Sequence, residues 1–129
     1  MASVYIVEPQ SLFEPELERL VSLAGARVAG SAAQLDLDEI IAAAPDAVLL
    51  DLDFTAYDVL DVLDVLQAEA PAIRPVVLTS ERGRGRLDRC RAYGAAAVVS
   101  KDATDLEMVH DLRVVLDGGS VWDQRVEAA

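Results

Sequence analysis

Residues 47–50, AVLL, form a continuous apolar run that leads directly into two acidic residues, Asp51 and Asp53. An apolar run without polar alternation is typical of a strand that is buried on both faces. An unpaired charge at the edge of a hydrophobic core is costly, so carboxylates in this position need a partner or a chemical role. Two explanations are open: the carboxylates cap the following loop, or they form a site that accepts phosphate or binds a metal.

Polar side chains also follow other apolar runs in the sequence: Glu8, Thr79 with Ser80, and Lys101. Carboxylates, a hydroxyl group and an ammonium group together suit phosphoryl transfer. The carboxylates hold a divalent cation, one of them attacks phosphorus, and the other groups bind the phosphoryl oxygens. A loop cap alone would not predict Thr79 and Lys101 at neighbouring strand ends, so the pattern favours a site.

Five strand–helix units are expected to position these residues. The expected strands are residues 4–7, 27–30, 47–51, 75–80 and 96–100, and the expected helices are 12–24, 35–44, 57–69, 86–93 and 103–116. This alternation predicts an α/β fold with a doubly wound parallel sheet, helices on both faces and right-handed crossovers. In such a sheet the functional groups gather at the carboxyl ends of the strands.

Length and composition restrict the class of protein. The chain has 129 residues, 53% of them hydrophobic, which suits one domain with a single core. A net charge of −12 disfavours nonspecific binding to nucleic acid. Cys90 is the only cysteine, so no internal disulfide can form and a reducing cytoplasm is the expected location. The start, MASVY, has neither a basic region nor a long apolar segment, which argues against a signal peptide and a membrane span.

With these elements and residues in order, the sequence resembles the receiver domain of bacterial two-component response regulators. The resemblance covers nearly the whole chain and rests on VYIVE, AVLLDLD, VVLTS, GAAAVVSK and the closing GGSVWDQRV. It implies a flavodoxin-like, five-stranded parallel sheet in the order 2-1-3-4-5 with five helices. Residues 1–118 would form the receiver-like domain, and 119–129 a C-terminal tail or the start of a linker to an absent output domain.

The resemblance also assigns roles to single residues. Asp51 looks like the phosphoacceptor, Thr79 the switch hydroxyl and Lys101 the conserved lysine of the family. Glu8 would be the first member of an acidic pair that binds Mg²⁺ together with Asp51. Asp53 would offer its backbone carbonyl to the same metal. The protein would then take part in a phosphorelay, and it would not be an enzyme beyond accepting a phosphoryl group.

The sequence departs from the family pattern at several of these positions. Pro9 replaces the second acidic residue, so any Mg²⁺ is expected to bind weakly. Val98 replaces the aromatic switch residue, and Glu81 stands where the family varies the residues that tune phosphoryl lifetime. Thr55 and Asp102 replace two expected prolines. These changes leave an alternative open: a pseudo-receiver that acts as a protein-interaction module without phosphorylation.

The expected partners are a sensor histidine kinase or phosphotransfer protein, and an output protein or a second copy in a homodimer. Ten of the eleven basic residues are arginines, and five of these fall within residues 82–91. Arg82, Arg86 and Arg89 would lie on one face of the fourth helix, beside the fifth strand and fifth helix. They would pair with the acidic residues of the preceding helix or form a basic binding surface. No membrane contact and no direct DNA binding by this chain are expected.

A phosphatase is the remaining alternative, because DLDFT (51–55) also fits the first motif of haloacid-dehalogenase-like phosphatases. Two features count against it. That motif normally ends the first strand, whereas two strand–helix units precede it here. No strand is expected after Lys101 to carry the further acidic pair that those enzymes need.

Overall fold

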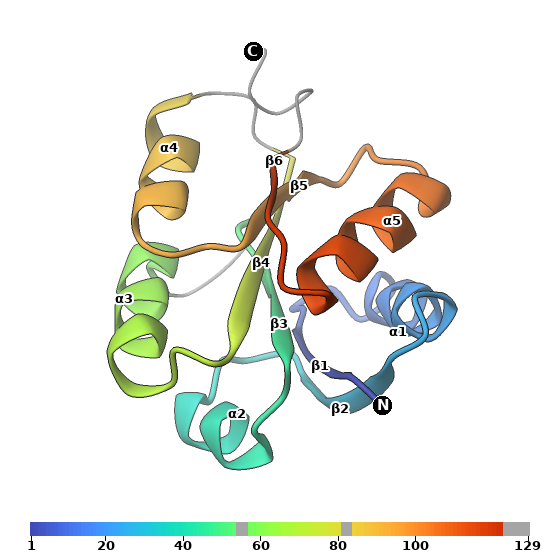
Figure 1. Cartoon of the computed structure of the whole chain (residues 1–129), viewed down its shortest axis with the longest axis horizontal. Coiled ribbons are helices and arrows are strands. Elements are labelled where there is room, and N and C mark those ends of the chain that lie inside the picture. The colour runs from blue at the N-terminus through green and yellow to red at the C-terminus, as the bar shows by residue number, and fades with distance from the viewer. Residues whose placement is uncertain (54–56, 81–83, 123–129) are drawn as a thin grey trace.

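The computed structural model describes residues 1–53, 57–80 and 84–122, with the backbone alone described for residues 84–86. Within these residues the chain forms a six-stranded parallel sheet and five helices (Figure 1). The strands are β1 (Ser3–Val7), β2 (Arg27–Ala32), β3 (Ala47–Asp51), β4 (Arg74–Thr79), β5 (Ala97–Ser100) and β6 (Val121–Trp122). The helices are α1 (Glu14–Leu23), α2 (Leu37–Ala43), α3 (Val59–Glu69), α4 (Arg84–Ala92) and α5 (Asp105–Leu116).

The strand order is β2-β1-β3-β4-β5-β6, which confirms the predicted order 2-1-3-4-5 and adds one short strand. Every residue of β1, β3 and β5 is buried, as is every residue of β4 after Arg74. This explains why these segments read as continuous apolar runs rather than as alternating ones. β2 lies at the edge of the sheet and none of its residues is fully buried, so its apolar signal in the sequence is weaker.

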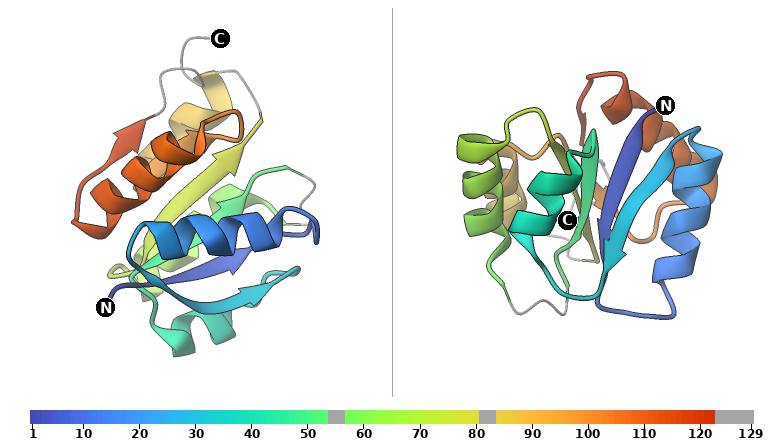
Figure 2. Two further views of the ribbon diagram at one scale, coloured as in Figure 1. Left: turned by 90° about the vertical axis from the view of Figure 1, so that its right-hand side faces the viewer. Right: turned by 90° about the horizontal axis from the view of Figure 1, so that it is seen from below.

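The helices cover both faces of the sheet. α1 and α5 lie on one face, and α2, α3 and α4 lie on the other (Figures 1 and 2). Each face therefore has its own hydrophobic core, and the side chains of each strand alternate between the two cores. Because all the strands run parallel, their carboxyl ends lie at one edge of the sheet between these two cores.

Side chains at helix N-termini set where three of the helices begin. The Asp36 carboxylate accepts from the backbone N–H of Glu39 ahead of α2, and Asp58 does the same for Leu60 ahead of α3. Before α5, Thr104 and Glu107 form a reciprocal capping box. Caps of this kind satisfy backbone donors that the first helical turn leaves unpaired.

The sixth strand was not expected from the sequence. After α5 the chain turns at Gly118, whose φ of 94° is one that glycine adopts readily. The next residues return along β5, where Val98 pairs with Trp122. The Arg91 guanidinium lies 4.3 Å from the centre of the Trp122 ring, which adds a cation–π contact to the strand pairing. This part of the closing GGSVWDQRV segment is therefore packed on the domain.

In the described part of the chain, no helix combines the length and the apolar character that crossing a membrane requires.

Candidate functional site

The carboxyl ends of β1, β3, β4 and β5 carry the four polar residues that the sequence singled out. Glu8, Asp51 and Thr79 are all buried. The side chain of Lys101 is 14% exposed, so its ammonium group approaches the others from the rim of the sheet. The fold thus places two carboxylates, a hydroxyl group and an ammonium group at one edge of the sheet, as predicted.

The Asp51 carboxylate is fully buried and both of its oxygens accept hydrogen bonds. Oδ2 accepts from the Lys101 ammonium group at 2.8 Å, and Oδ1 accepts from the backbone N–H of Asp53 at 2.7 Å. Asp51 and Lys101 therefore form a salt bridge. These contacts fix the carboxylate at the floor of the strand ends, which suits a nucleophile that must meet an incoming group in one orientation.

Lys101 joins two carboxylates. Its ammonium nitrogen lies 2.8 Å from Asp51 Oδ2 and 3.2 Å from Asp53 Oδ2, and 5.5 Å from the centre of the Phe13 ring. Burial by itself would lower the pKa of Lys101, but Asp51 and then Asp53 outweigh it and raise the pKa. The lysine therefore stays charged and is available to neutralise an anion at this edge of the sheet.

The Asp53 carboxylate also connects the ends of two strands. Besides Lys101, its Oδ2 accepts a hydrogen bond from the backbone N–H of Ser80, just after β4, at 3.0 Å. Burial by itself would raise the pKa of Asp53, but the hydrogen bonds from Ser80 and the charge of Lys101 lower it. The resemblance assigned only the backbone carbonyl of Asp53 to the site, whereas here the side chain contacts it as well.

Glu8 is a buried acid with incomplete hydrogen bonding. Its Oε1 accepts from the backbone N–H of Gln10 at 3.0 Å, while Oε2 has no hydrogen-bond partner among the described atoms. Burial, and then the neighbouring Asp51 carboxyl group, raise the pKa of Glu8 to about 7. Near neutral pH this acid is therefore protonated in a large fraction of molecules.

These donors fit a divalent cation poorly. Across residues 1–53, 57–80 and 84–122, no group of three or more acidic, histidine or cysteine side chains is placed to hold a metal. Pro9, next to Glu8, offers no side-chain ligand, and Asp53 directs its carboxylate to Lys101 and Ser80. Among the described residues, Glu8 Oε2 has no hydrogen-bond partner and could therefore serve as one ligand of a cation. Mg²⁺, which demands near-ideal octahedral oxygen coordination, would find few ligands here.

Several residues that the sequence assigned to a function lie away from the site or outside the residues that the structure describes. Glu81 and Arg82 lie outside the described residues, as does the side chain of Arg86. Arg89 is exposed on α4. Val98 is buried in β5 beside Trp122, one strand away from β4 and its Thr79. The basic surface proposed for these arginines is therefore described only in part.

Two residues of the site were missed in the sequence. The Tyr57 hydroxyl donates to the backbone carbonyl of Asp51 at 3.2 Å. Burial, and then the charges of Asp51 and Glu8, raise the pKa of Tyr57. Phe13 lies close to Lys101 and comes from the turn before α1. Both fall in the first residues of the predicted helices 12–24 and 57–69 but lie just before the observed helices. Nothing in the local pattern indicated that their rings turn toward Asp51 and Lys101.

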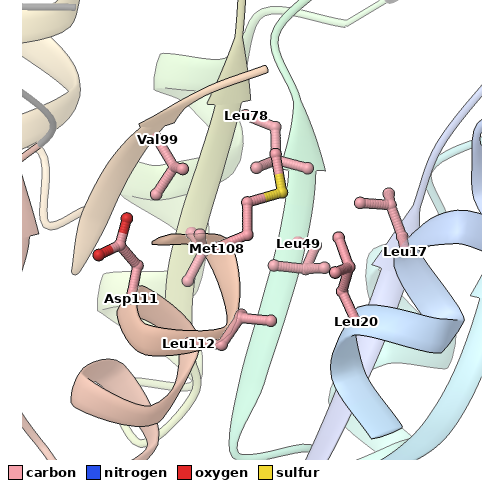
Figure 3. A pocket seen from close by; sticks show the side chains of 9 residues that line it. Leu17, Leu20, Leu49, Leu78, Val99, Met108, Asp111 and Leu112 are labelled. Carbon is pink, nitrogen blue, oxygen red and sulfur yellow. The ribbon is translucent and has the colours of Figure 1, made fainter. Parts of the chain in front are cut away.

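A small apolar cavity lies elsewhere, between α1, α5 and the sheet (Figure 3). It measures about 10 Å³, and its walls include Leu20 of α1, Leu49 of β3 and Met108 of α5. A space of this size and lining would hold at most one water molecule and offers it no set of polar partners. The candidate site is therefore the cluster of polar strand ends and not this cavity.

Comparisons with known proteins agree with this fold. No family model matches the chain. A transcriptional regulatory protein, MctR of Rhizobium johnstonii, is 29% identical over 82 residues, which are 64% of this chain and 38% of that protein. The match thus spans about two fifths of the length of this curated relative.

Solved structures match over almost the whole chain. The signal receiver domain of the putative response regulator NarL of Mycobacterium tuberculosis has a TM-score of 0.83 and 25% identity, covering 91% of this chain and 97% of that one. The isolated REC domain of RcsB from Salmonella enterica serovar Typhimurium, determined with the phosphomimetic BeF₃⁻, has a TM-score of 0.86 and 13% identity. Its match covers 97% and 95% of the two chains. A two-component response regulator of the LuxR family from an Aurantimonas species has a TM-score of 0.88 and 20% identity, with 98% and 95% covered. These likenesses show that the chain has the fold of the receiver domains of two-component response regulators.

Proposed function

We propose that this receiver accepts a phosphoryl group on Asp51 from a sensor histidine kinase or a phosphotransfer protein, in the cytoplasm. The observation that carries the proposal is the Asp51 carboxylate itself, buried at the end of β3 with Lys101 2.8 Å away. A buried carboxylate with a cation beside it and a hydroxyl-bearing neighbour strand suits the addition of a group that brings negative charge. Receiver domains act as phosphoacceptors and are not enzymes in the proper sense, so the phosphatase alternative is not proposed.

The residues of the site would each have a separate role in this transfer. One Asp51 oxygen forms the new bond to phosphorus, while the bond from phosphorus to the donor atom breaks and the donor leaves with the electron pair. The N–H of Asp53 and the ammonium group of Lys101 hold the carboxylate in place. Lys101 then faces the added charge, and Thr79 stands at the end of the neighbouring strand β4 as the proposed switch hydroxyl.

The proposal predicts a mass increase of one phosphoryl group after incubation with acetyl phosphate and Mg²⁺, measured by intact-protein mass spectrometry. Asp51→Asn should abolish the increase, because an amide cannot form the acyl phosphate. Asp64→Asn is the matched control, since it removes one carboxylate from the exposed face of α3. Modification that persists in Asp51→Asn would place the acceptor elsewhere, and no modification at all would favour the pseudo-receiver.

The same reaction tests the expected weakness of the metal. Since Pro9 supplies no ligand and Glu8 is partly protonated near neutral pH, the rate should still rise with Mg²⁺ above about 1 mM rather than saturate below it. Saturation of the rate at lower Mg²⁺ would show that other groups complete the coordination sphere.

We also propose that the signal leaves through the face formed by α4, β5 and α5, by contact with an output protein or a second copy. Arg89 and Arg91 are exposed on α4, on a body whose net charge is −12, and opposed potentials speed association. Arg89→Glu is therefore expected to slow association with an acidic partner or to reduce self-association, measured by analytical ultracentrifugation and pull-down. Arg27→Glu, an exposed change on β2, is the control with the same change of charge. Equal effects of the two changes would argue against a specific face.

A further inference from the structure

One oxygen atom, Asp53 Oδ2, collects two hydrogen-bond donors from two different strand ends. The Lys101 ammonium group lies 3.2 Å from it and the backbone N–H of Ser80 lies 3.0 Å from it. The same ammonium group lies 2.8 Å from Asp51 Oδ2, so a single lysine joins the two carboxylates. The side chain of Asp53 is 11% exposed, so its charge is only partly screened by water.

A phosphoryl group on Asp51 would need these donors. It would bring further anionic oxygens to a carboxylate whose nearest described cation is Lys101, and an anion of this kind is held by ammonium and backbone N–H groups. In the structure, Asp53 shares the Lys101 ammonium group with Asp51, and the Ser80 N–H is directed at Asp53. The Asp53 carboxylate also repels any second anion placed within a few ångströms of it.

We propose that the Asp53 carboxylate is an internal competitor of the phosphoryl group, holding Lys101 and the Ser80 N–H until Asp51 is modified. The inference rests on the proposed function of Asp51. Modification then requires the donors to leave Asp53, wholly or in part, which loosens the connection between the ends of β3 and β4. Asp53 is thus a positioning residue that weakens phosphoryl binding and couples it to movement of the chain at Ser80.

The alternative role is a purely structural tie between two strand ends. The two roles predict opposite results, because loss of a structural tie would loosen the site and weaken the binding of an anion. Loss of a competitor would strengthen the binding of an anion. Asp53→Asn separates them well, since the amide oxygen can still accept from Ser80 while the negative charge is gone.

The test is binding of beryllofluoride, a phosphoryl mimic, followed by NMR at fixed Mg²⁺ concentration in the whole chain. Lys101 is the only lysine, so its ammonium signal is identified without ambiguity. Asp53→Asn is expected to bind beryllofluoride about fivefold more tightly than the natural chain. Asp64→Asn, which removes the same charge from exposed α3, should bind it as the natural chain does.

A second readout needs no phosphoryl mimic. In Asp53→Ala, the Ser80 amide and the Lys101 ammonium hydrogens should exchange with water faster than in the natural chain, because their shared acceptor is gone. Unchanged exchange at both positions overturns the inference, since Asp53 would then hold neither donor. Equal or weaker beryllofluoride binding in Asp53→Asn also overturns it and leaves the proposed function intact. Absence of binding in both proteins overturns the competitor role together with the proposed function.

Discussion

Replacing Lys101 by methionine is expected to lower the free energy of unfolding by about 3 kcal/mol, because it leaves Asp51 buried without its counter-charge. The Asp51 side chain is fully buried, and the Lys101 ammonium group donates to it at 2.8 Å. Asp53 loses the same cation, although its remaining hydrogen bond from Ser80 persists. Methionine keeps an unbranched apolar stem of similar length, so the change tests the charge and not the packing.

Urea unfolding followed by circular dichroism measures this loss, and a double-mutant cycle assigns it. Asp51→Asn removes the buried charge, so Lys101→Met should cost much less in the Asp51→Asn background than in the natural chain. A loss of the same size in both backgrounds would mean that the lysine contributes through contacts such as that with Phe13, and not through Asp51.

Glu8→Gln is expected to stabilise the protein above neutral pH and to have little effect near pH 4. Burial, and then the Asp51 carboxyl group, raise the pKa of Glu8 from its ordinary value of 4.5 to about 7. Between these two values the folded chain binds more protons than the unfolded chain, so stability falls as the pH rises from about 4.5 to about 7. Well above pH 7 the folded state carries the full penalty of an ionised, buried carboxylate, on the order of 3 kcal/mol. Glutamine has nearly the same shape and cannot ionise, so the penalty disappears.

The measurement is urea unfolding from pH 4 to pH 8 for the natural chain and the variant. The difference in stability between them should grow with pH and level off above about pH 7. Glu69→Gln, an exposed change at the end of α3, is the control and should give a difference that stays small throughout. A constant difference for Glu8→Gln would show that Glu8 does not take up a proton on folding in this range.

Much of the fold follows from local patterns. The strand at Ala47–Asp51 has the bounds that the apolar run predicted, and the other predicted strands and helices differ from the structure by a few residues at their ends. Helix ends depend on caps such as Thr104 with Glu107, whose geometry is local but is not visible in hydrophobic periodicity. The alternation of strands and helices also sufficed to predict that Asp51, Thr79 and Lys101 meet, because parallel strands end at one edge.

The last strand, β6, could not be predicted from local sequence patterns. Val121 and Trp122 are a two-residue strand, too short to carry a periodic signal. They pair with β5 only because the turn after α5 returns the chain to that edge, where Arg91 of α4 contacts the Trp122 ring. A strand of this kind is created by its neighbours and has no stability of its own.

By itself the sequence determined the parallel sheet and the residues at the carboxyl ends of its strands, since both depend on the polarity of short segments and on chain connectivity. The order of the strands was implied by the resemblance to receiver domains. Only the tertiary structure decided what those side chains do to one another. The direction of the Asp53 carboxylate toward Ser80 and Lys101, and the approach of Tyr57 to Asp51, depend on rotamers selected by neighbours distant in the sequence. The raised pKa of Glu8 depends on complete burial beside a second acid, and burial is a property of the packed fold and not of the residue.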